Sequence, residues 1–220
     1  MSLEPLEQLL QDAARALTPR RLERIRAAAA ARLDGLAVAF DSVHDPHNIS
    51  AALRSCDAFG VQHIHLAGPS RDVLPNRGVT KGCERWLSFH WHETAAECVD
   101  ALHGAGYRVL LAMQGDNSLA LHDVDFGQRV ALVFGNEHSG VSEEFQRLAD
   151  GCYHIPMAGF VESLNVSVAV AVSLNHAAAA RRRAVGRSTD MTPEANQRLL
   201  SAWLRRELDA RKGWRIDQQA

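Results

Sequence analysis

The fold is decided by the stretch IPMAGFVESLNVS, residues 155–167. A short β-rich segment, residues 152–155, runs into Pro156, and Gly159 follows, so we predict a turn here rather than a continuing strand. A helix of small residues is expected to begin near Ser163, where unpaired N–H groups and the positive end of the helix dipole attract polar or anionic partners. A strand, a loop and a polar helix start are typical of a ligand site.

Strands and helices alternate outward from this stretch. The expected strands cover residues 36–40, 61–66, 86–91, 107–113, 129–134 and 153–155. The expected helices cover residues 3–33, 48–59, 94–103, 142–149 and 164–185, and another follows Pro193. This alternation predicts an α/β fold in which a mostly parallel sheet carries helices on both faces.

Composition narrows the class of protein. A chain of 220 residues, 46% hydrophobic and 23% charged, is long enough for one α/β domain with added helices. It contains no apolar run of the roughly 20 residues that a membrane helix needs, and its acidic N-terminus does not resemble an export signal. We therefore predict no membrane segment. The four cysteines form no CxxC pair, so we predict free thiols in a cytoplasmic protein and no metal site.

Charge is distributed unevenly along the chain. Residues 1–180 hold 14 Lys and Arg against 21 Asp and Glu, whereas residues 181–220 hold 10 against 5. An acidic body with a basic C-terminal segment suits a polyanion such as RNA. The alternative is a solvated basic helix face without a nucleic-acid partner.

Two further loops follow expected strands. The segment DSVHDPHNISAALR, residues 41–54, places Asn48 as a helix N-cap and Arg54 more than one turn later. Its structural alternative is that Asn48 only caps the helix while Arg54 pairs with Asp57. The segment FGNEHSG, residues 134–140, has glycines that permit close backbone approach to a ligand, or it is an ordinary turn. The chain has neither a GxGxxG fingerprint nor a GxxxxGK[ST] loop, which argues against a dinucleotide dehydrogenase and a P-loop NTPase.

Together the three loops resemble a known family. The segments HNISAALRSCDAFGV, LVFGNEHSGVSEE and IPMAGFVESLNVSVAVAVSL are similar, in order and spacing, to the three motifs of the SpoU/TrmH-type RNA 2′-O-ribose methyltransferases of the SPOUT class. The short helical extensions are most similar to the tRNA-modifying branch, which methylates a D-loop guanosine. The resemblance implies a helical extension over residues 1–35, a methyltransferase domain over 36–185 and a basic helical extension over 186–220.

The resemblance also implies S-adenosylmethionine as cofactor, a C-terminal trefoil knot, an RNA substrate and a homodimer. Small residues at four-residue spacing, Ala169, Ser173 and Ala177, would let a partner helix approach, although a helix buried within one chain shows the same pattern. The expected substrate is tRNA. The alternatives are ribosomal RNA and a non-catalytic RNA-binding protein on the same scaffold.

The family pattern implies two groups of site residues. The positions that match its polar functional residues are Asn48, Arg54, Glu137, Ser163 and Asn165. The positions that match its cofactor-binding loops are Phe134, Gly135, Asn136, Ile155, Met157, Ser163 and Leu164. Arg54 matches the family's catalytic arginine, often described as a general base. Because a guanidinium stays protonated in proteins, we expect Arg54 to bind the RNA phosphate and stabilise the developing alkoxide.

Three positions depart from the family pattern. Asp45 and His138 stand where lysine is common, and Glu162 stands where glutamine is frequent. Each change lowers the positive charge near the expected RNA-binding face.

Overall fold

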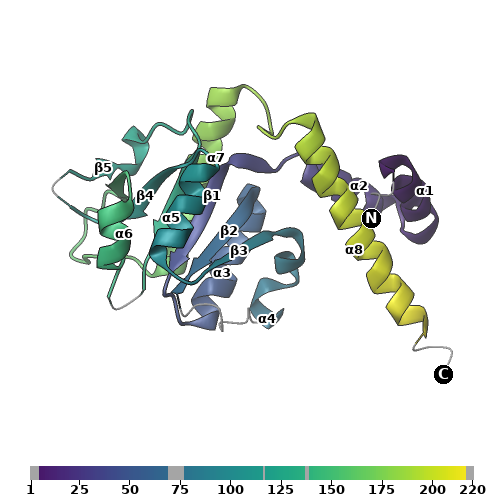
Figure 1. Cartoon of the computed structure of the whole chain (residues 1–220), viewed down its shortest axis with the longest axis horizontal. Helices are drawn as coiled ribbons and strands as arrows, with labels where there is room; N and C mark the ends of the chain where they lie inside the picture. Colours follow the sequence, from purple (N-terminus) through teal and green to yellow (C-terminus); the bar gives the residue numbers. More distant parts are fainter. Residues whose placement is uncertain (1–4, 69–76, 116, 137–138, 217–220) are drawn as a thin grey trace. The chain divides into compact units, whose positions relative to one another are not determined.

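The computed structural model describes residues 5–68, 77–115, 117–136 and 139–216 (Figure 1). The chain forms two compact units, residues 33–190 and residues 1–32 with 191–220. Within the described part of the chain, no helix has both the length and the apolar content that a bilayer crossing requires.

The larger unit is built on seven parallel strands. Their order across the sheet is β3-β2-β1-β6-β4-β7-β5, and every pair of neighbours is parallel. The strands are β1 (Leu33–Asp41), β2 (Val61–Ala67), β3 (Ser88–His92), β4 (Arg108–Ala112), β5 (Leu119–Ala120), β6 (Val130–Phe134) and β7 (Gly151–His154). The prediction of a parallel α/β sheet is therefore confirmed, and β5 is a short strand that the sequence did not indicate.

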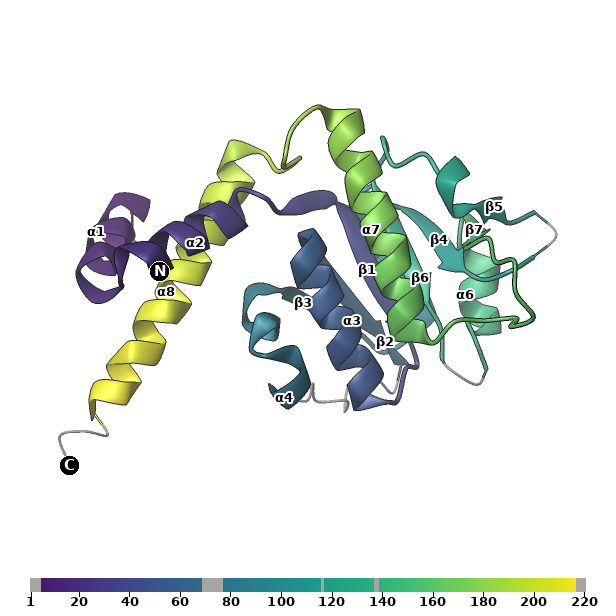
Figure 2. The same cartoon turned by 180° about the vertical axis from the view of Figure 1, so that it is seen from behind.

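Helices cover both faces of this sheet. The helical segments are α3 (Pro46–Phe59), α4 (Arg77–Thr80), α5 (Ala95–Gly104), α6 (Glu143–Leu148) and α7 (Val166–Val185), with 3₁₀ turns η2 (Cys83–Trp86) and η3 (Leu121–Asp123). Figure 1 shows α5 and α6 on one face, and Figure 2 shows α3 and α7 on the other.

Side-chain alternation along β1 explains the two layers. Val38 and Phe40 belong to the hydrophobic cluster that includes residues of α3 and α7, whereas Ala37 and Ala39 belong to the cluster that includes residues of α5 and α6. Successive residues of a strand point to opposite faces, so the part of β1 that is covered on both faces, residues 36–40, is apolar throughout.

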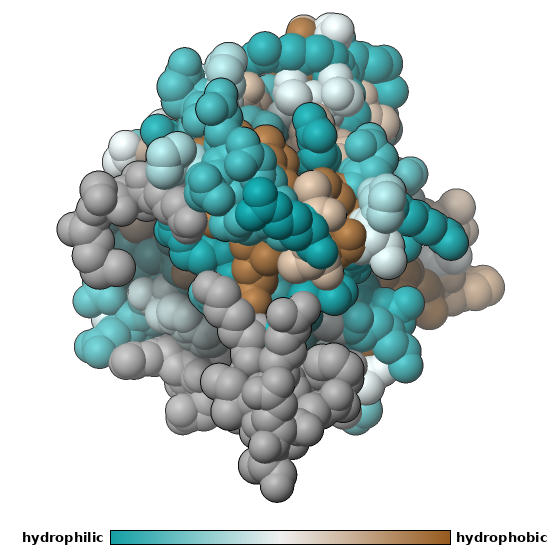
Figure 3. All heavy atoms as spheres, turned by 90° about the vertical axis from the view of Figure 1, so that its right-hand side faces the viewer, coloured by the Kyte–Doolittle hydropathy of each residue, from teal (hydrophilic) through white to brown (hydrophobic). Residues whose placement is uncertain are grey.

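The smaller unit consists of α1 (Leu6–Ala16), α2 (Pro19–Ala29) and α8 (Pro193–Ile216). The expectation of one helix over residues 3–33 is wrong, because Pro19 starts a new helix whose N-cap is Thr18. Arg21 pairs with Glu207 across α2 and α8 at 3.2 Å, and Arg32 lies over the buried ring of Trp203. Hydrophilic residues dominate the face drawn in Figure 3, with hydrophobic ones between them.

Candidate functional site

Three loops leave the sheet at the carboxyl ends of β1, β6 and β7. Because these strands are parallel, their carboxyl ends lie on one edge of the sheet, which is where open α/β sheets bind ligands. The first two loops are adjacent, since β1 and β6 are hydrogen-bonded neighbours with Phe40 opposite Phe134.

Two hydrogen bonds join the first loop to the second. The buried carboxylate of Asp41 accepts a hydrogen bond from the Ser142 amide at 2.6 Å. The side-chain amide of Asn136 donates to the Ser42 carbonyl at 2.8 Å, and Ser42 itself adopts a positive φ of 53°. The sequence interpretation gave no role to Asp41 or Ser42. An acidic residue directly after the apolar run of residues 36–40 was the available signal for Asp41.

The second loop folds back on itself at Gly135. Asn136 and Gly140 form an antiparallel bridge, with both N–O distances 2.9 Å. A Cβ atom on Gly135 would lie 2.2 Å from the Gly140 carbonyl carbon and 2.3 Å from the Val141 nitrogen. The loop's own backbone therefore requires glycine at 135. Glu137 and His138 lie outside the described residues.

The third loop ends at Asn165, not at Ser163. α7 begins at Val166, and the Asn165 side-chain oxygen caps it by accepting from the Ser167 amide at 2.9 Å. The expected helix start near Ser163 is therefore wrong: the cap is Asn165, two positions later, whose side chain bonds the Ser167 amide. Ser163 is exposed in the loop.

Asn165 also joins the third loop to α3. Its side-chain nitrogen donates to the Asn48 side-chain oxygen at 3.1 Å. Asn48 lies in the first turn of α3 and does not cap it, contrary to expectation. Asp45 is the N-cap and accepts from the His47 amide at 2.8 Å, because Pro46 occupies the first helical position.

Arg54 lies six residues beyond Asn48, about 9 Å further along the axis of α3 at 1.5 Å per residue. Its side chain is exposed. Arg54 acts electrostatically on Cys83 in η2: burial raises the pKa of the Cys83 thiol to about 11, and the guanidinium opposes that rise. An exposed guanidinium at this position of α3 is free to approach an anionic ligand from solvent.

The remaining cofactor candidates supply apolar surface and main chain. Ile155, Met157 and Leu164 are half-buried, while the Phe134 side chain is buried in the core and leaves only its main chain for a ligand. Residues 155–164 belong to no helix or strand, so their amides and carbonyls are not committed to regular structure. Half-buried apolar side chains beside irregular main chain fit an adenosine-containing ligand.

Apolar side chains are exposed on this loop and on the outer side of α7. Phe160 is fully exposed and Val161 is mostly exposed. On α7, Val168 is 46% exposed and Val172 is 40% exposed. By contrast, Ser173 and Ala177 are buried within the chain, and Ser173 accepts a hydrogen bond from the Tyr153 hydroxyl at 2.9 Å. Their small size therefore serves intrachain packing, which was the alternative for this pattern.

Comparison with known proteins identifies the family. Residues 35–175 match the SpoU rRNA Methylase family. A tRNA (guanosine(18)-2′-O)-methyltransferase of Thermus thermophilus is 37% identical over 190 residues, which cover 86% of this chain and 98% of the relative.

Solved structures agree with this match. A TrmH/SpoU tRNA modifying enzyme of Aquifex aeolicus superposes with a TM-score of 0.77 at 30% identity, covering 86% of this chain and 96% of the other. The SpoU methyltransferase AviRb of Streptomyces viridochromogenes, in complex with AdoMet, gives a TM-score of 0.60 at 32% identity, covering 74% and 65%. The chain therefore belongs to the SpoU methylase family.

Proposed function

We propose that this SpoU-family chain transfers a methyl group from S-adenosylmethionine to the ribose 2′-hydroxyl of a guanosine in tRNA. The observation that carries the proposal is the joining of the three motif loops at one sheet edge, through the contacts Asn136–Ser42 and Asn165–Asn48. The near-complete coverage of the Thermus thermophilus tRNA methyltransferase supports tRNA as the substrate. A tRNA substrate also favours the cytoplasm as the place of reaction.

The cofactor is held chiefly by main chain in this proposal. S-adenosylmethionine supplies an electrophilic methyl group on a sulfonium. The loop residues that would enclose it are Phe134, Gly135, Asn136, Ile155, Met157, Ser163 and Leu164. Fixing the methyl donor and the ribose in one orientation supplies a large part of the rate acceleration.

Arg54 acts on the RNA. Its guanidinium can bind a phosphate through two parallel hydrogen bonds and stabilise negative charge that develops on the ribose oxygen. The hydrogen bond between Asn48 and Asn165 keeps the third loop against α3. Because Arg54 lies on the same helix, this contact would hold the distance between the loop and the arginine constant. Glu137 is proposed to organise the second loop, as its place in the motif suggests.

Dimerisation and the knot belong to the same proposal. The exposed side chains of Phe160, Val161, Val168 and Val172 form the kind of apolar surface that a second copy of the chain would cover. We also propose that the C-terminal part of the sheet domain forms a trefoil knot. The catalytic domain would cover residues 36–185, with helical extensions over residues 1–35 and 186–220.

Ribosomal RNA is the second candidate substrate, because the family description itself names rRNA. RNA is recognised largely by shape and by exposed single-stranded loops, so one catalytic site serves either substrate.

Transfer of labelled methyl groups tests the function. The purified chain is incubated with methyl-labelled S-adenosylmethionine and either unmodified total tRNA or total rRNA. We expect label in tRNA, recovered as 2′-O-methylguanosine after nuclease digestion. Label found only in rRNA would establish the second candidate. Label in neither RNA would contradict the enzymatic proposal.

A further inference from the structure

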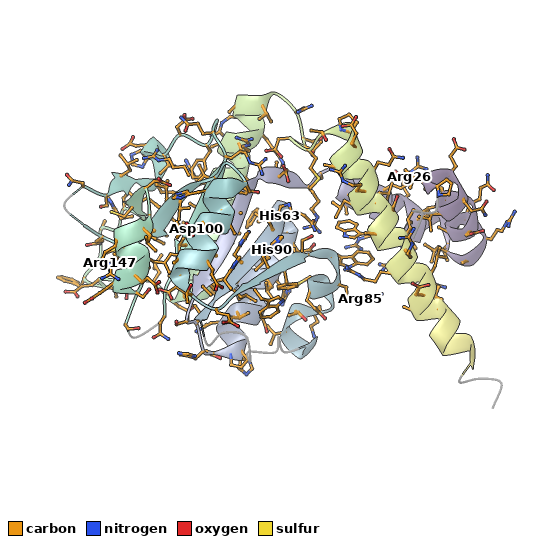
Figure 4. The ribbon with its side chains drawn as sticks, viewed as in Figure 1. Arg26, His63, Arg85, His90, Asp100 and Arg147 are labelled. Atoms are coloured by element: carbon orange, nitrogen blue, oxygen red, sulfur yellow. The ribbon has the colours of Figure 1, made fainter. Side chains whose placement is uncertain are left out.

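Histidines line one face of the sheet near its β3 edge. His63 and His65 alternate along β2, and His90 and His92 alternate along β3. The register places His65 opposite His90 and Ala67 opposite His92, so all four side chains share the face on which α5 packs. Figure 4 labels His63 and His90 side by side on this face.

Two of these histidines converge with a cysteine from α5. His65 Nδ1 lies 3.0 Å from His92 Nε2, and their rings are stacked with centroids 5.2 Å apart. One nitrogen of each histidine and the Cys98 Sγ all lie within 4.8 Å of one another. His65 is 5% exposed, Cys98 is fully buried and His92 is partly exposed. His65 and Cys98 are thus shielded from solvent, and an ion from solvent would reach them past His92.

We propose that His65, His92 and Cys98 bind a zinc-class transition-metal ion. Two imidazoles and one thiolate are the ligand types that Zn²⁺ prefers, and water would complete a tetrahedral set. Mg²⁺ and Ca²⁺ are disfavoured, since both select oxygen ligands. Donor atoms in a tetrahedral zinc site lie about 3.3–3.5 Å apart, given bonds of about 2.0–2.3 Å. The three side chains therefore need only small rotations to close on the ion.

Binding converts a thiol into a thiolate. The Cys98 thiol loses its proton to solvent as the Zn–S bond forms. Of the two histidines, the one that donates the N–H···N bond moves that proton, through solvent, to its other ring nitrogen. Each histidine then contributes a nitrogen lone pair, and two Zn–N bonds replace the hydrogen bond. One proton per ion is therefore released, and it comes from the cysteine.

The surrounding charges favour a cation. The Asp41 carboxylate acts on Cys98, and the Glu97 carboxylate acts on His92. His63 and His90 on this face also act electrostatically on His65.

A chain of hydrogen bonds orients the histidine that lies against His65. Asp34 lies 3.1 Å from His63 Nε2, and His63 Nδ1 lies 3.1 Å from His90 Nε2. The His90 ring stacks on His65 with centroids 4.5 Å apart, so this chain supports the proposed site by packing against one ligand. None of these residues belongs to the three methyltransferase loops.

This inference departs from the sequence expectation of no metal site. The ligands come from β2, β3 and α5, and 27 residues separate the two histidines, so no compact ligand spacing could reveal them. Only the strand pairing brings them together.

Metal titration of the full-length chain tests the proposal. The protein is stripped with a chelator and titrated with Zn²⁺ by calorimetry in two buffers that differ in ionisation enthalpy, and with Co²⁺ by absorption spectroscopy. We expect one ion per chain, release of one proton and a thiolate-to-Co²⁺ charge-transfer band.

Matched variants assign the ligands. Cys98→Ser and His92→Gln should each weaken Zn²⁺ binding by about tenfold or more, and Cys98→Ser should abolish the charge-transfer band. Cys83→Ser and His122→Gln, which change a second buried cysteine and an exposed histidine, should change neither. His92 is partly exposed, so its variant should fold even if Cys98→Ser does not. Absence of binding in the wild type, or unchanged affinity in His92→Gln, would overturn the proposal.

Discussion

At the scale of single residues, the site depends on side chains that make two contacts at once. The Asn165 amide oxygen caps α7 while its nitrogen reaches Asn48 in α3. Asp41 likewise ends β1 and accepts the amide that precedes α6. Such residues couple the start of a helix to a neighbouring loop, so their replacement should alter function as well as stability.

Substitution of Asn165 separates these two contacts. Asn165→Ser keeps a good N-cap but is too short to reach Asn48, so stability should stay within about 0.5 kcal/mol of wild type while methyl transfer falls. Asn165→Ala removes both interactions and should cost about 1 kcal/mol of stability as well. Urea unfolding and kcat/KM on tRNA measure the two effects. Full activity in Asn165→Ser would show that the Asn48 contact is dispensable.

The planar fork of Arg54 is tested by Arg54→Lys. Lysine keeps the charge but cannot form the bidentate hydrogen bonds, so we expect kcat to fall by about tenfold or more, equivalent to about 1.4 kcal/mol of barrier. Arg183→Lys, an exposed arginine of α7, is the control and should behave as wild type. Near-normal turnover of Arg54→Lys on tRNA would rule out the bidentate role.

At the scale of elements, the backbone of the loop after β6 is closely packed. Gly135→Ala would press a methyl group against the backbone of Gly140 and Val141, so we expect a decrease of about 1–3 kcal/mol in stability and weaker cofactor binding. Gly104→Ala, where no atom lies within 4 Å of the added carbon, should be tolerated. Urea unfolding and calorimetric titration with S-adenosylmethionine compare the two variants. Equal stability of both would contradict the close packing.

The pH dependence of stability tests the interactions of Asp34, a carboxylate in β1. His63 and Arg129 bond the Asp34 carboxylate and hold its pKa well below the usual value, so the unfolded chain takes up this proton at a higher pH than the native chain. Its contribution to stability is therefore present above about pH 4, the unfolded pKa, and is lost as pH falls below it.

The wild-type chain should lose stability when the pH is lowered from 5 to 3. Asp34→Asn should lose less, by on the order of 1 kcal/mol in unfolding free energy. Asp123→Asn, at an exposed position on η3, should leave that decrease unchanged. Urea unfolding at both pH values, with chelator present, measures it. An identical decrease in Asp34→Asn and wild type would remove this role.

Regular elements could be predicted from the sequence where local signals agreed. Gly60 ends α3 in a left-handed conformation, and apolar runs mark β1 and β6, as expected. Errors occurred at helix starts, where two capping residues compete: Asp45 caps instead of Asn48, and Asn165 caps instead of a start near Ser163. The break before Pro19 was signalled by Thr18 and was overlooked.

The site itself was only partly predictable. The motif residues identified the loops, but the contacts of Asn165 with Asn48 and of Asn136 with Ser42 join segments 117 and 94 residues apart, which no local pattern encodes. The same holds for the histidines and Cys98, whose proximity follows from strand pairing and helix packing.

At the scale of the whole molecule, the basic C-terminal segment does not separate cleanly from the catalytic domain. Arg181 is buried and donates to the carbonyls of residues 126, 127 and 128 as well as to Asp190. Cutting the chain after Ala180 would therefore disrupt the sheet domain. RNA binding by the basic C-terminal segment must be tested by charge substitution instead.

Two exposed arginines of α8 provide that test. Replacing Arg198 and Arg206 together with glutamine should weaken tRNA binding and reduce its salt dependence, by about one unit of slope for each phosphate that is no longer bound. Arg147→Gln on α6 is the control and should change neither. Filter binding across a range of salt concentrations gives both quantities. An unchanged slope in the double variant would exclude α8 from the RNA-binding surface.

The most direct measurement maps ribose methylation in tRNA from cells that lack this protein. We predict that 2′-O-methylation of one guanosine disappears, returns with the wild-type chain and does not return with Arg54→Ala. Unchanged ribose methylation of tRNA in the deletion strain, or full restoration by Arg54→Ala, would contradict the account.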